Sequence, residues 1–258
     1  GSGSENRNCS KLLRTIQERN KEMAMKRYKL TICLLTVGAT LIALPGRSAE
    51  TKNNLPGDDI KEKYALVYST DFEEGAHEWE PMDKENWSIV KSDEGQIYRL
   101  GSRSTYEPMV KSPRSRSVLK DIVVSDFVFE VKVKSRDKED GAHQDMIVFF
   151  GYRGPTKFYY VHFGMKTDEK SNQIHLVNDE PRRPISKHTS KENPGTNWDD
   201  NWHQVKVIRK GALIQVFFDD MAKPCMSVED ETFLSGGFGI GSFNNFGDWD
   251  DVKIWGGE

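Results

Sequence analysis

The chain has 258 residues and a formal net charge of −3, and 36% of its residues are hydrophobic, which is enough for one packed domain. Residues 1–49 hold 9 of the 37 basic residues and 3 of the 40 acidic ones, so the remainder carries 28 basic and 37 acidic residues, a net charge of −9. That acidity excludes non-specific binding to nucleic acid, and an anionic glycan would need a local basic patch.

The N-terminal region has the order of a leader followed by a linker. Residues 1–22 resemble neither, and we interpret them as an upstream extension or a remnant of recombinant expression. In residues 23–49 a basic cluster precedes an apolar run over 30–44 and a small-residue exit, as in a secretory signal peptide. This run is shorter than the about 20 residues that span a bilayer, so we expect cleavage and a secreted or periplasmic domain, with a signal anchor as the alternative. A polar linker over 50–63 then precedes one domain, 64–258.

Cysteine usage limits how that domain can be stabilised. Cys225 is the single cysteine after the leader, so an intramolecular disulfide is excluded and we expect stability to come from a packed core. The sequence shows no Cys/His cluster with zinc spacing. We therefore expect Cys225 to be a small buried residue.

After the linker, short runs of alternating apolar and polar residues predict an all-β domain. The predicted strands are 64–68, 87–90, 96–100, 127–134, 146–152, 158–163, 174–177, 205–209 and 213–218. Turn residues separate them, as in Arg153-Gly154-Pro155-Thr156 and Lys210-Gly211, and no helical period is sustained. This pattern favours a β-sandwich of two antiparallel sheets.

The C-terminal segment 234–255 predicts a closing hairpin. Glycines at 236, 237, 239 and 241 alternate with Phe238 and Ile240, and an Asp-rich turn at 248–251 runs into a second alternating strand. One face of the first strand would be apolar and the other almost bare, so that another group can approach the backbone.

These segments resemble the concanavalin A-like jelly rolls. The motifs are Asp-Phe-Val-Phe-Glu-Val at 126–131, Trp-His-Gln-Val-Lys-Val at 202–207, Gln-Val-Phe-Phe-Asp-Asp at 215–220 and the closing segment. Their order is similar to that in bacterial secreted laminin-G-like, family 16 glycoside hydrolase-like and 3-keto-disaccharide hydrolase-like domains. The resemblance spans about residues 64–257 and implies a jelly-roll β-sandwich with a poly- or oligosaccharide as the ligand.

Two kinds of glycan chemistry are alternatives to binding alone. Retaining family 16 glycosidases place two carboxylates along one strand as Glu-x-Asp-x-Glu, about 5 to 5.5 Å apart, and the sequence has no such pattern. Some jelly-roll alginate lyases carry Gln-Ile-His, which is similar to Gln173-Ile174-His175. The Arg-rich and Tyr-Lys-Gly-Tyr strands of those lyases have no counterpart in this sequence.

One group of polar and aromatic residues predicts a sugar-binding patch on the concave sheet. Residues two apart share a strand face, so Tyr160 joins His162, and Gln173 joins His175. With Gly164 opposite Gln173, His162 would lie directly across from His175, whereas a slip of one residue would separate the two imidazoles. A tyrosine ring would stack on a sugar, and an arginine would meet a carboxylate or sulfate. The ligand-binding candidates are Glu130, His143, Asp145, Tyr160, His162, His175, Asn178, Arg182 and Arg183, and the candidate catalytic residues are His175, Tyr160 and His162.

No cofactor is required by this reading, but one structural calcium ion is a further expectation. Many jelly rolls hold calcium between the end of the first strand and the closing segment, where Asp71 and Asp250 or Asp251 stand in this chain. Calcium takes six to eight oxygen ligands, which carboxylates and carbonyls would have to supply.

The sequence thus favours a secreted glycan-binding domain that serves polysaccharide capture or degradation. The alternatives are a polysaccharide lyase or glycoside hydrolase acting on the same face, and a laminin-G-like adhesion module that uses rim loops such as 187–201.

Overall fold

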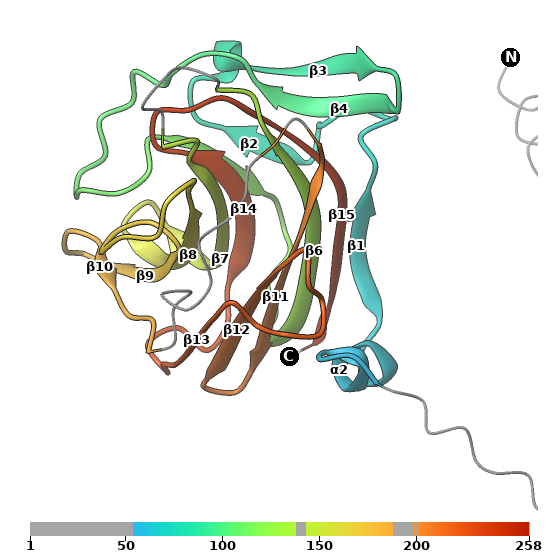
Figure 1. Cartoon of the computed structure of the whole chain (residues 1–258), viewed down its shortest axis with the longest axis vertical. Helices are drawn as coiled ribbons and strands as arrows, with labels where there is room; N and C mark the ends of the chain where they lie inside the picture. Colours follow the sequence, from blue (N-terminus) through green and yellow to red (C-terminus); the bar gives the residue numbers. More distant parts are fainter. Residues whose placement is uncertain (1–53, 138–142, 188–198, 200, 258) are drawn as a thin grey trace, which may run out of the picture. The chain divides into compact units, whose positions relative to one another are not determined.

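The computed structural model describes residues 54–137, 143–187, 199 and 201–257. The predicted leader and upstream segment lie outside these residues. In the described part of the chain, two antiparallel sheets pack face to face (Figure 1). The predicted jelly-roll sandwich is therefore confirmed. None of the helices described is long and apolar enough to cross a membrane.

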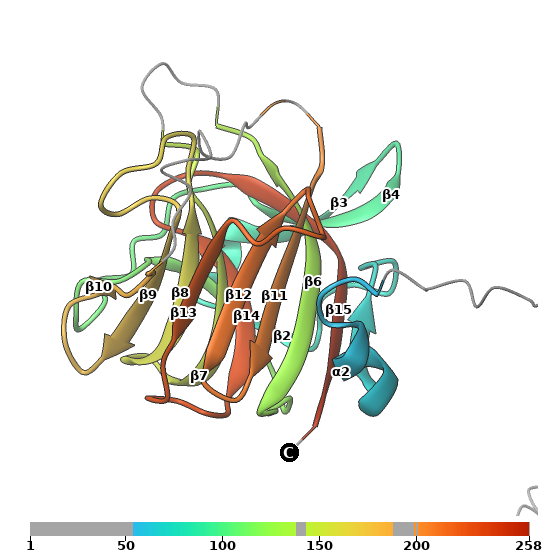
Figure 2. The same cartoon turned by 60° about the horizontal axis from the view of Figure 1, so that its bottom comes forward.

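The first sheet has eight strands. They are β1 (Leu66–Thr70), β3 (Trp87–Ser92), β4 (Gly95–Leu100), β6 (Asp126–Ser135), β11 (His203–Lys210), β12 (Leu213–Phe218), β13 (Met226–Glu229) and β15 (Gly247–Gly257). Their spatial order is β13, β12, β11, β6, β15, β4, β3, and β1 pairs with the second half of β15. Figure 2 shows β13, β12, β11, β6 and β15 side by side in front of the other sheet.

The second sheet has seven strands. They are β2 (Trp79–Pro81), β5 (Ser115–Leu119), β7 (Met146–Gly154), β8 (Lys157–Phe163), β9 (Gln173–Asn178), β10 (Arg183–Pro184) and β14 (Gly237–Ser242). Their order is β10, β9, β8, β7, β14, β5, β2. Both turns predicted from glycine are present, one between β7 and β8 and the other between β11 and β12.

The core between the sheets follows the alternation read from the sequence. Phe127 and Phe129 of β6 are at most 1% exposed, and their rings lie 4.9 and 5.2 Å from the ring of Phe238 on β14. Burying one such side chain contributes about 1.5–3 kcal/mol. Cys225 is also buried in this core, as predicted, and burial raises its pKa to about 12.

Part of the predicted linker is folded. Residues Asp58–Lys63 form the helix α2, and the buried Ile60 packs with Val128, Ile208 and Phe217. These three residues alternate with core residues on β6, β11 and β12, so α2 covers the outer face of the eight-stranded sheet. A 3-10 turn, η1 (Lys84–Asn86), precedes β3.

The closing segment does not form the predicted hairpin. β14 pairs with β5 and β7 in one sheet, while β15 pairs with β6, β4 and β1 in the other. The connection lies at 243–246, and the Asp-rich residues 248–251 belong to β15 itself. The apolar faces of the two strands, with Phe238 on one and Trp249 on the other, are buried in the same core from opposite sides.

Candidate functional site

The outer face of the seven-stranded sheet carries a second buried cluster. On β8, Phe158 and Tyr160 point away from the sandwich core because their neighbours Tyr159 and Val161 point into it. The Tyr160 ring stacks on the His175 ring of β9, with centroids 4.7 Å apart and an interplanar angle of 4°. We call Asp145, Tyr160, His162, His175 and Arg182 the Tyr160 cluster.

The pairing of β8 with β9 differs from the predicted register by two residues. Tyr160 lies opposite His175, and His162 lies opposite Gln173. The Asn172 side chain bonds both backbone groups of Gly164, at 3.0 and 3.2 Å, so the loop closes before Gly164 can pair with Gln173. Because a shift of two keeps every side chain on its face, the two imidazoles still share one face, with ring centroids 6.1 Å apart.

His162 and Asp145 form a buried pair. The Nε2 atom of His162 lies 2.6 Å from Oδ1 of Asp145, and both residues are at most 6% exposed. The backbone of Asp145 is held on both sides: its N–H donates to Asn245 Oδ1 at 3.0 Å, and its carbonyl accepts from Ser242 Oγ at 2.8 Å. The carboxylate therefore fixes the orientation of the His162 ring.

His175 lies deeper still. It is 0% exposed, and neither ring nitrogen has a hydrogen-bonding partner within the described residues. Burial, followed by the nearby His162 and Arg182, lowers the pKa of His175 to about 2. Its imidazole is thus neutral at any physiological pH.

Arg182 connects the cluster to the surface. Its Nη1 donates to Tyr160 Oη at 3.1 Å, and its guanidinium carbon lies 4.1 Å from the Phe243 ring centroid. Burial raises the pKa of Tyr160, against the lowering effect of Arg182, so the hydroxyl group stays protonated. Arg182 itself is partly exposed, whereas Tyr160 is not.

Part of the segment 101–114, which we call the cover, packs on this face through the half-buried Val110. The sequence did not reveal this contact. The buried Arg116 of β5 donates to Ser112 Oγ at 2.6 Å, Pro113 O at 2.7 Å and Pro155 O at 2.9 Å. The Arg182 N–H donates to Lys111 O at 2.9 Å, which joins the cover to the turn after β9. The predicted open groove over Tyr160 and His175 is therefore closed in this structure.

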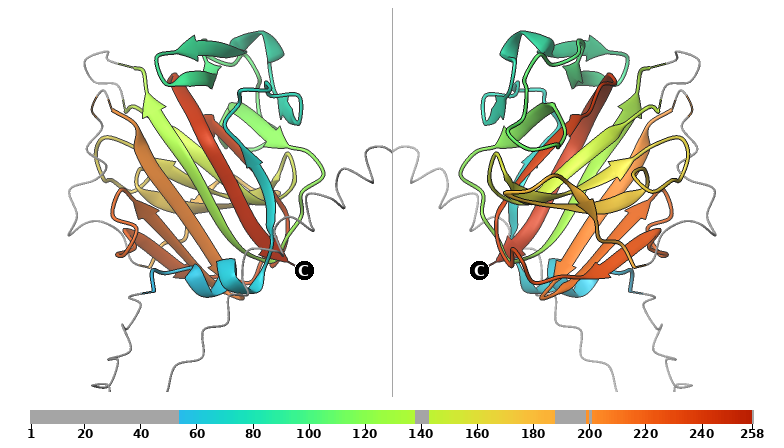
Figure 3. Two further views of the ribbon diagram at one scale, coloured as in Figure 1. Left: turned by 90° about the vertical axis from the view of Figure 1, so that its right-hand side faces the viewer. Right: turned by 90° about the vertical axis from the view of Figure 1, so that its left-hand side faces the viewer.

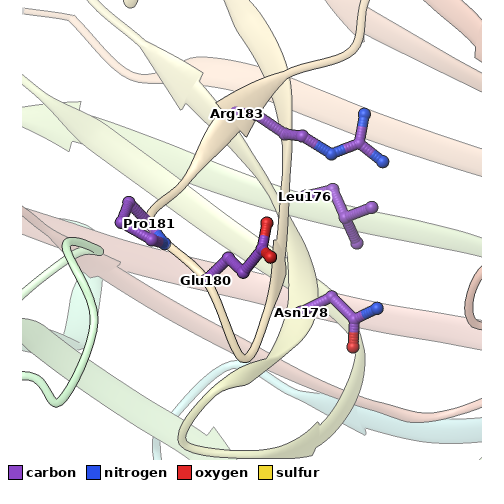
Figure 4. Close-up of a pocket in the computed structure, with 5 residues that line it drawn as sticks. All are labelled: Leu176, Asn178, Glu180, Pro181 and Arg183. Carbon is purple, nitrogen blue, oxygen red and sulfur yellow. The ribbon is translucent and has the colours of Figure 1, made fainter.

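Two further candidates line a small pocket at the neighbouring sheet edge. Asn178, at the end of β9, and Arg183, in β10, line a pocket of about 180 Å³ together with Leu176, Glu180 and Pro181. Figure 4 shows the side chains of Leu176, Asn178 and Arg183 projecting to the same side of the ribbon. Asn178, Glu180 and Arg183 are exposed, so their polar groups are available to a ligand.

Two candidates stay apart from these residues. His143 is exposed beside the undescribed residues 138–142, and its carbonyl accepts from the Met165 N–H at 2.9 Å. Glu130 was predicted to line the same groove, but it lies on the eight-stranded sheet and pairs with Lys61 of α2 at 2.6 Å. Alternation identified its face correctly, but the sequence did not show that β6 and β8 belong to different sheets.

The predicted calcium ligands lie where β15 changes partner from β4 to β1. A bulge there lies between Asp250 and Lys253 and contains Asp251, and Asp71 directly follows β1. Among the described residues, no group of three or more His, Cys, Asp or Glu side chains could hold a metal ion. Asp251 instead pairs with Lys132 at 2.6 Å. Calcium at this site remains a proposal that depends on carbonyl ligands.

We expect Asp250→Asn to stabilise the domain at pH 7. Burial, supported by Asp251 and Asp71, raises the pKa of Asp250 from 3.8 to about 6. The folded state then binds more protons than the unfolded state between these values, so stability falls as pH rises through that window. Asparagine can still accept the 2.8 Å bond from the Asp251 N–H, and after allowance for solvent screening we expect a gain of about 1 kcal/mol.

Urea unfolding at pH 7 and pH 4 measures this gain, which should vanish at pH 4. The same titration with calcium chloride tests the metal proposal. If calcium binds through Asp250, it will raise the unfolding midpoint of the wild type and not that of the variant. A variant that is less stable than the wild type at pH 7 without calcium would contradict the pKa argument.

Comparison with known proteins identifies the fold but no family. No protein-family model matches the chain, and no curated protein matches it. A mutant of the GH43 protein BlXynB from Bacillus licheniformis is similar over 73% of this chain and 39% of its own length, with 12% identity and a TM-score of 0.52. The chain thus spans about two fifths of BlXynB. At this identity the similarity shows the fold alone, and it agrees with the jelly-roll β-sandwich of the structure.

Two other solved structures are similar at lower scores. The carbohydrate binding module CBM66 from Bacillus subtilis has 15% identity over 69% of this chain and 95% of its own, with a TM-score of 0.49. A Bacillus licheniformis beta-glucanase has 14% identity over 74% of this chain and 98% of its own, with a TM-score of 0.46.

Proposed function

We propose that this domain binds a glycan without turning it over, and that the turn between β9 and β10 is the contact surface. The pocket of about 180 Å³ carries the proposal, because an amide, a carboxylate and a guanidinium converge on it from Asn178, Glu180 and Arg183. Small numbers of convergent polar groups orient ligands in protein pockets, and guanidinium groups bind carboxylates or sulfates in two-point contacts.

Contacts with the Tyr160 cluster hold the turn between β9 and β10 in place. Arg182 is bonded to Tyr160 and to the cover at Lys111, so the turn is held at two points before a ligand arrives. Preorganisation of this kind lowers the conformational cost of binding. The preorganised turn favours polysaccharide capture, and the predicted signal peptide favours a secreted or periplasmic location.

Turnover is less well supported than binding. A lyase would need the His175 imidazole or the Tyr160 hydroxyl to reach an acidic sugar, and both side chains are 0% exposed. The raised pKa of Tyr160 also disfavours the phenolate that a proton-abstracting tyrosine needs. Most of the rim loop in the adhesion alternative lies outside the described residues.

We expect Arg183→Ala to weaken glycan binding while the unfolding midpoint stays unchanged. Loss of a charge-assisted hydrogen bond at an exposed site should cost about 1–2 kcal/mol, which is about five- to thirtyfold in Kd. A polysaccharide panel scored for retention on affinity gels and for released reducing ends or unsaturated products measures binding and turnover together.

Lys253→Ala is the control for that screen, because Lys253 is exposed on β15 in the other sheet. It should bind as the wild type does. Product release by the wild type would overturn the non-catalytic assignment. Equal retention of the wild type and Arg183→Ala would remove the turn from the binding site.

A further inference from the structure

A second pocket lies at the opposite side of the sandwich. The edge strand of each sheet on this side, β2 in one and β3 in the other, borders a pocket of about 530 Å³, which we call the edge pocket. Figure 1 shows β2 beside β3 and β4, and the views in Figure 3 show them gathered at the same end of the sandwich. The volume falls within the about 300–1,000 Å³ of typical ligand pockets.

The floor of the edge pocket is aromatic and rigid. Trp79, Trp87 and Tyr98 line it, and each is at most 7% exposed. The Tyr98 ring lies 4.9 Å from the Trp87 ring and 6.2 Å from the Trp79 ring. Trp79 Nε1 donates to Tyr68 Oη at 2.9 Å, and Tyr98 Oη lies 3.0 Å from Ser117 Oγ. These bonds fix the rings, so a ligand meets a preformed apolar surface.

The rim of the edge pocket carries one unbalanced positive charge. Lys120 donates to the His77 carbonyl at 2.9 Å and lies 4.0 Å from Glu80, so those two charges partly balance. Lys84, at the start of η1, is exposed, and its ammonium group forms no ion pair within the described part of the chain. A ligand with one negative charge would complement this rim.

We propose that the edge pocket binds a hexuronic acid residue, with its ring over the aromatic floor and its carboxylate at Lys84. The apolar face of a sugar ring packs well on aromatic side chains, and an exposed ion pair adds about 0.2–1 kcal/mol. This site is separate from the turn between β9 and β10, and the proposal rests on the proposed glycan-binding function. It gives this acidic domain the local basic contact that an anionic sugar needs.

The test is a titration followed by the indole N–H resonances of the intact domain. The probes are the methyl glycosides of glucuronic acid and of glucose, which differ at the carboxylate. We expect both probes to shift the Trp79 and Trp87 resonances, with the acid binding about 1.4- to fivefold more tightly. Lys84→Gln should remove this preference. Lys91→Gln should keep it, because Lys91 is exposed on β3 but does not line the edge pocket.

Three results would overturn the proposal. These are the absence of a shift at Trp79 and Trp87, equal affinity for the two probes, and an acid preference that survives Lys84→Gln. If any one of these results occurs while the panel still shows retention that depends on Arg183, only the edge pocket is refuted. If the wild type retains no polysaccharide and binds neither probe, the glycan-binding function fails as well.

Discussion

Replacing Gly241 with alanine should prevent folding or lower the free energy of unfolding by about 3 kcal/mol or more. A Cβ atom built on Gly241 would lie 2.0 Å from the backbone carbonyl oxygen of Ser115 and 3.1 Å from the Phe149 ring. Gly241 and Ser115 belong to paired strands, β14 and β5, so the sheet itself would have to separate locally. Overpacking typically costs about 1–3 kcal/mol, and a clash with fixed backbone lies at or above the upper end.

Urea unfolding followed by circular dichroism measures this loss. The matched control is Gly101→Ala, because the nearest atom to a Cβ at Gly101 is the Asn86 carbonyl oxygen at 3.9 Å. That variant should unfold at the same midpoint as the wild type, within error. A Gly241→Ala domain as stable as the control would show that β5 and β14 are not held at the spacing of this structure.

This glycine also shows what the sequence could predict. Alternation of glycine with Phe238 and Ile240 correctly predicted a strand with one apolar face and a close approach on the other. The approaching group is the backbone of β5 and the Phe149 ring of β7, not a ligand. Spacing along one strand therefore predicts the close approach, whereas the identity of the neighbour depends on pairing between distant segments.

The predicted hairpin in the closing segment was wrong for the same reason, because strand pairing depends on distant segments. Two alternating strands with a short connection read equally well as a hairpin within one sheet and as a crossover between two sheets. Local pattern does not separate these, because the core buries Phe238 and Trp249 in either case. The short strands β2, β5, β10 and β13 were also not predicted. β2 and β10 have three and two residues, which is too few for alternation to be detected.

For the candidate site, the sequence predicted which sheet face the side chains lie on, but not whether that face is accessible to a ligand. Tyr160, His162 and His175 do share one face, as period-2 spacing implies, and Arg182 bonds Tyr160. The cover was missed, because residues 101–114 show no alternating pattern and are held by hydrogen bonds to residues distant in the sequence or outside the segment, among them Asp83, Arg116 and Arg182. In the sequence, a covered polar cluster on an outer sheet face therefore has the same pattern as an open patch.

His175→Phe should make the domain markedly more resistant to acid. In the folded state the pKa of His175 is lowered from 6.5 to about 2, so between these values the unfolded chain binds the extra proton. Acid therefore favours unfolding, and the contribution of His175 to stability is fully present above about pH 6.5 and is lost as pH falls. The slope is at most about 1.4 kcal/mol per pH unit.

Phenylalanine keeps a ring against Tyr160, where the stacking distance is 4.7 Å, and it removes two buried nitrogens that have no described partner. Removing these two unpartnered nitrogens stabilises the folded state by about 1–3 kcal/mol, which at pH 8 offsets the cost of packing a slightly larger ring. Relative to the difference at pH 8, the variant should then gain about 2–3 kcal/mol over the wild type at pH 4.5. His162, Asp145 and Arg182 are present in both proteins, so the difference between the two pH profiles of stability reports on residue 175.

Paired urea titrations at pH 8 and pH 4.5 measure this gain. His175→Ala is the comparison variant, because it also removes the imidazole but leaves a cavity beside Tyr160. A wild type and His175→Phe variant that lose stability in parallel would show that the imidazole is protonated, and hence hydrated, in the folded state. Glycan retention by His175→Phe shows whether residue 175 only supports the binding site or contacts the sugar. Because His175 is 0% exposed, we expect retention to be unchanged, and loss of retention at unchanged stability would place the imidazole against the sugar and make the lyase alternative the stronger one.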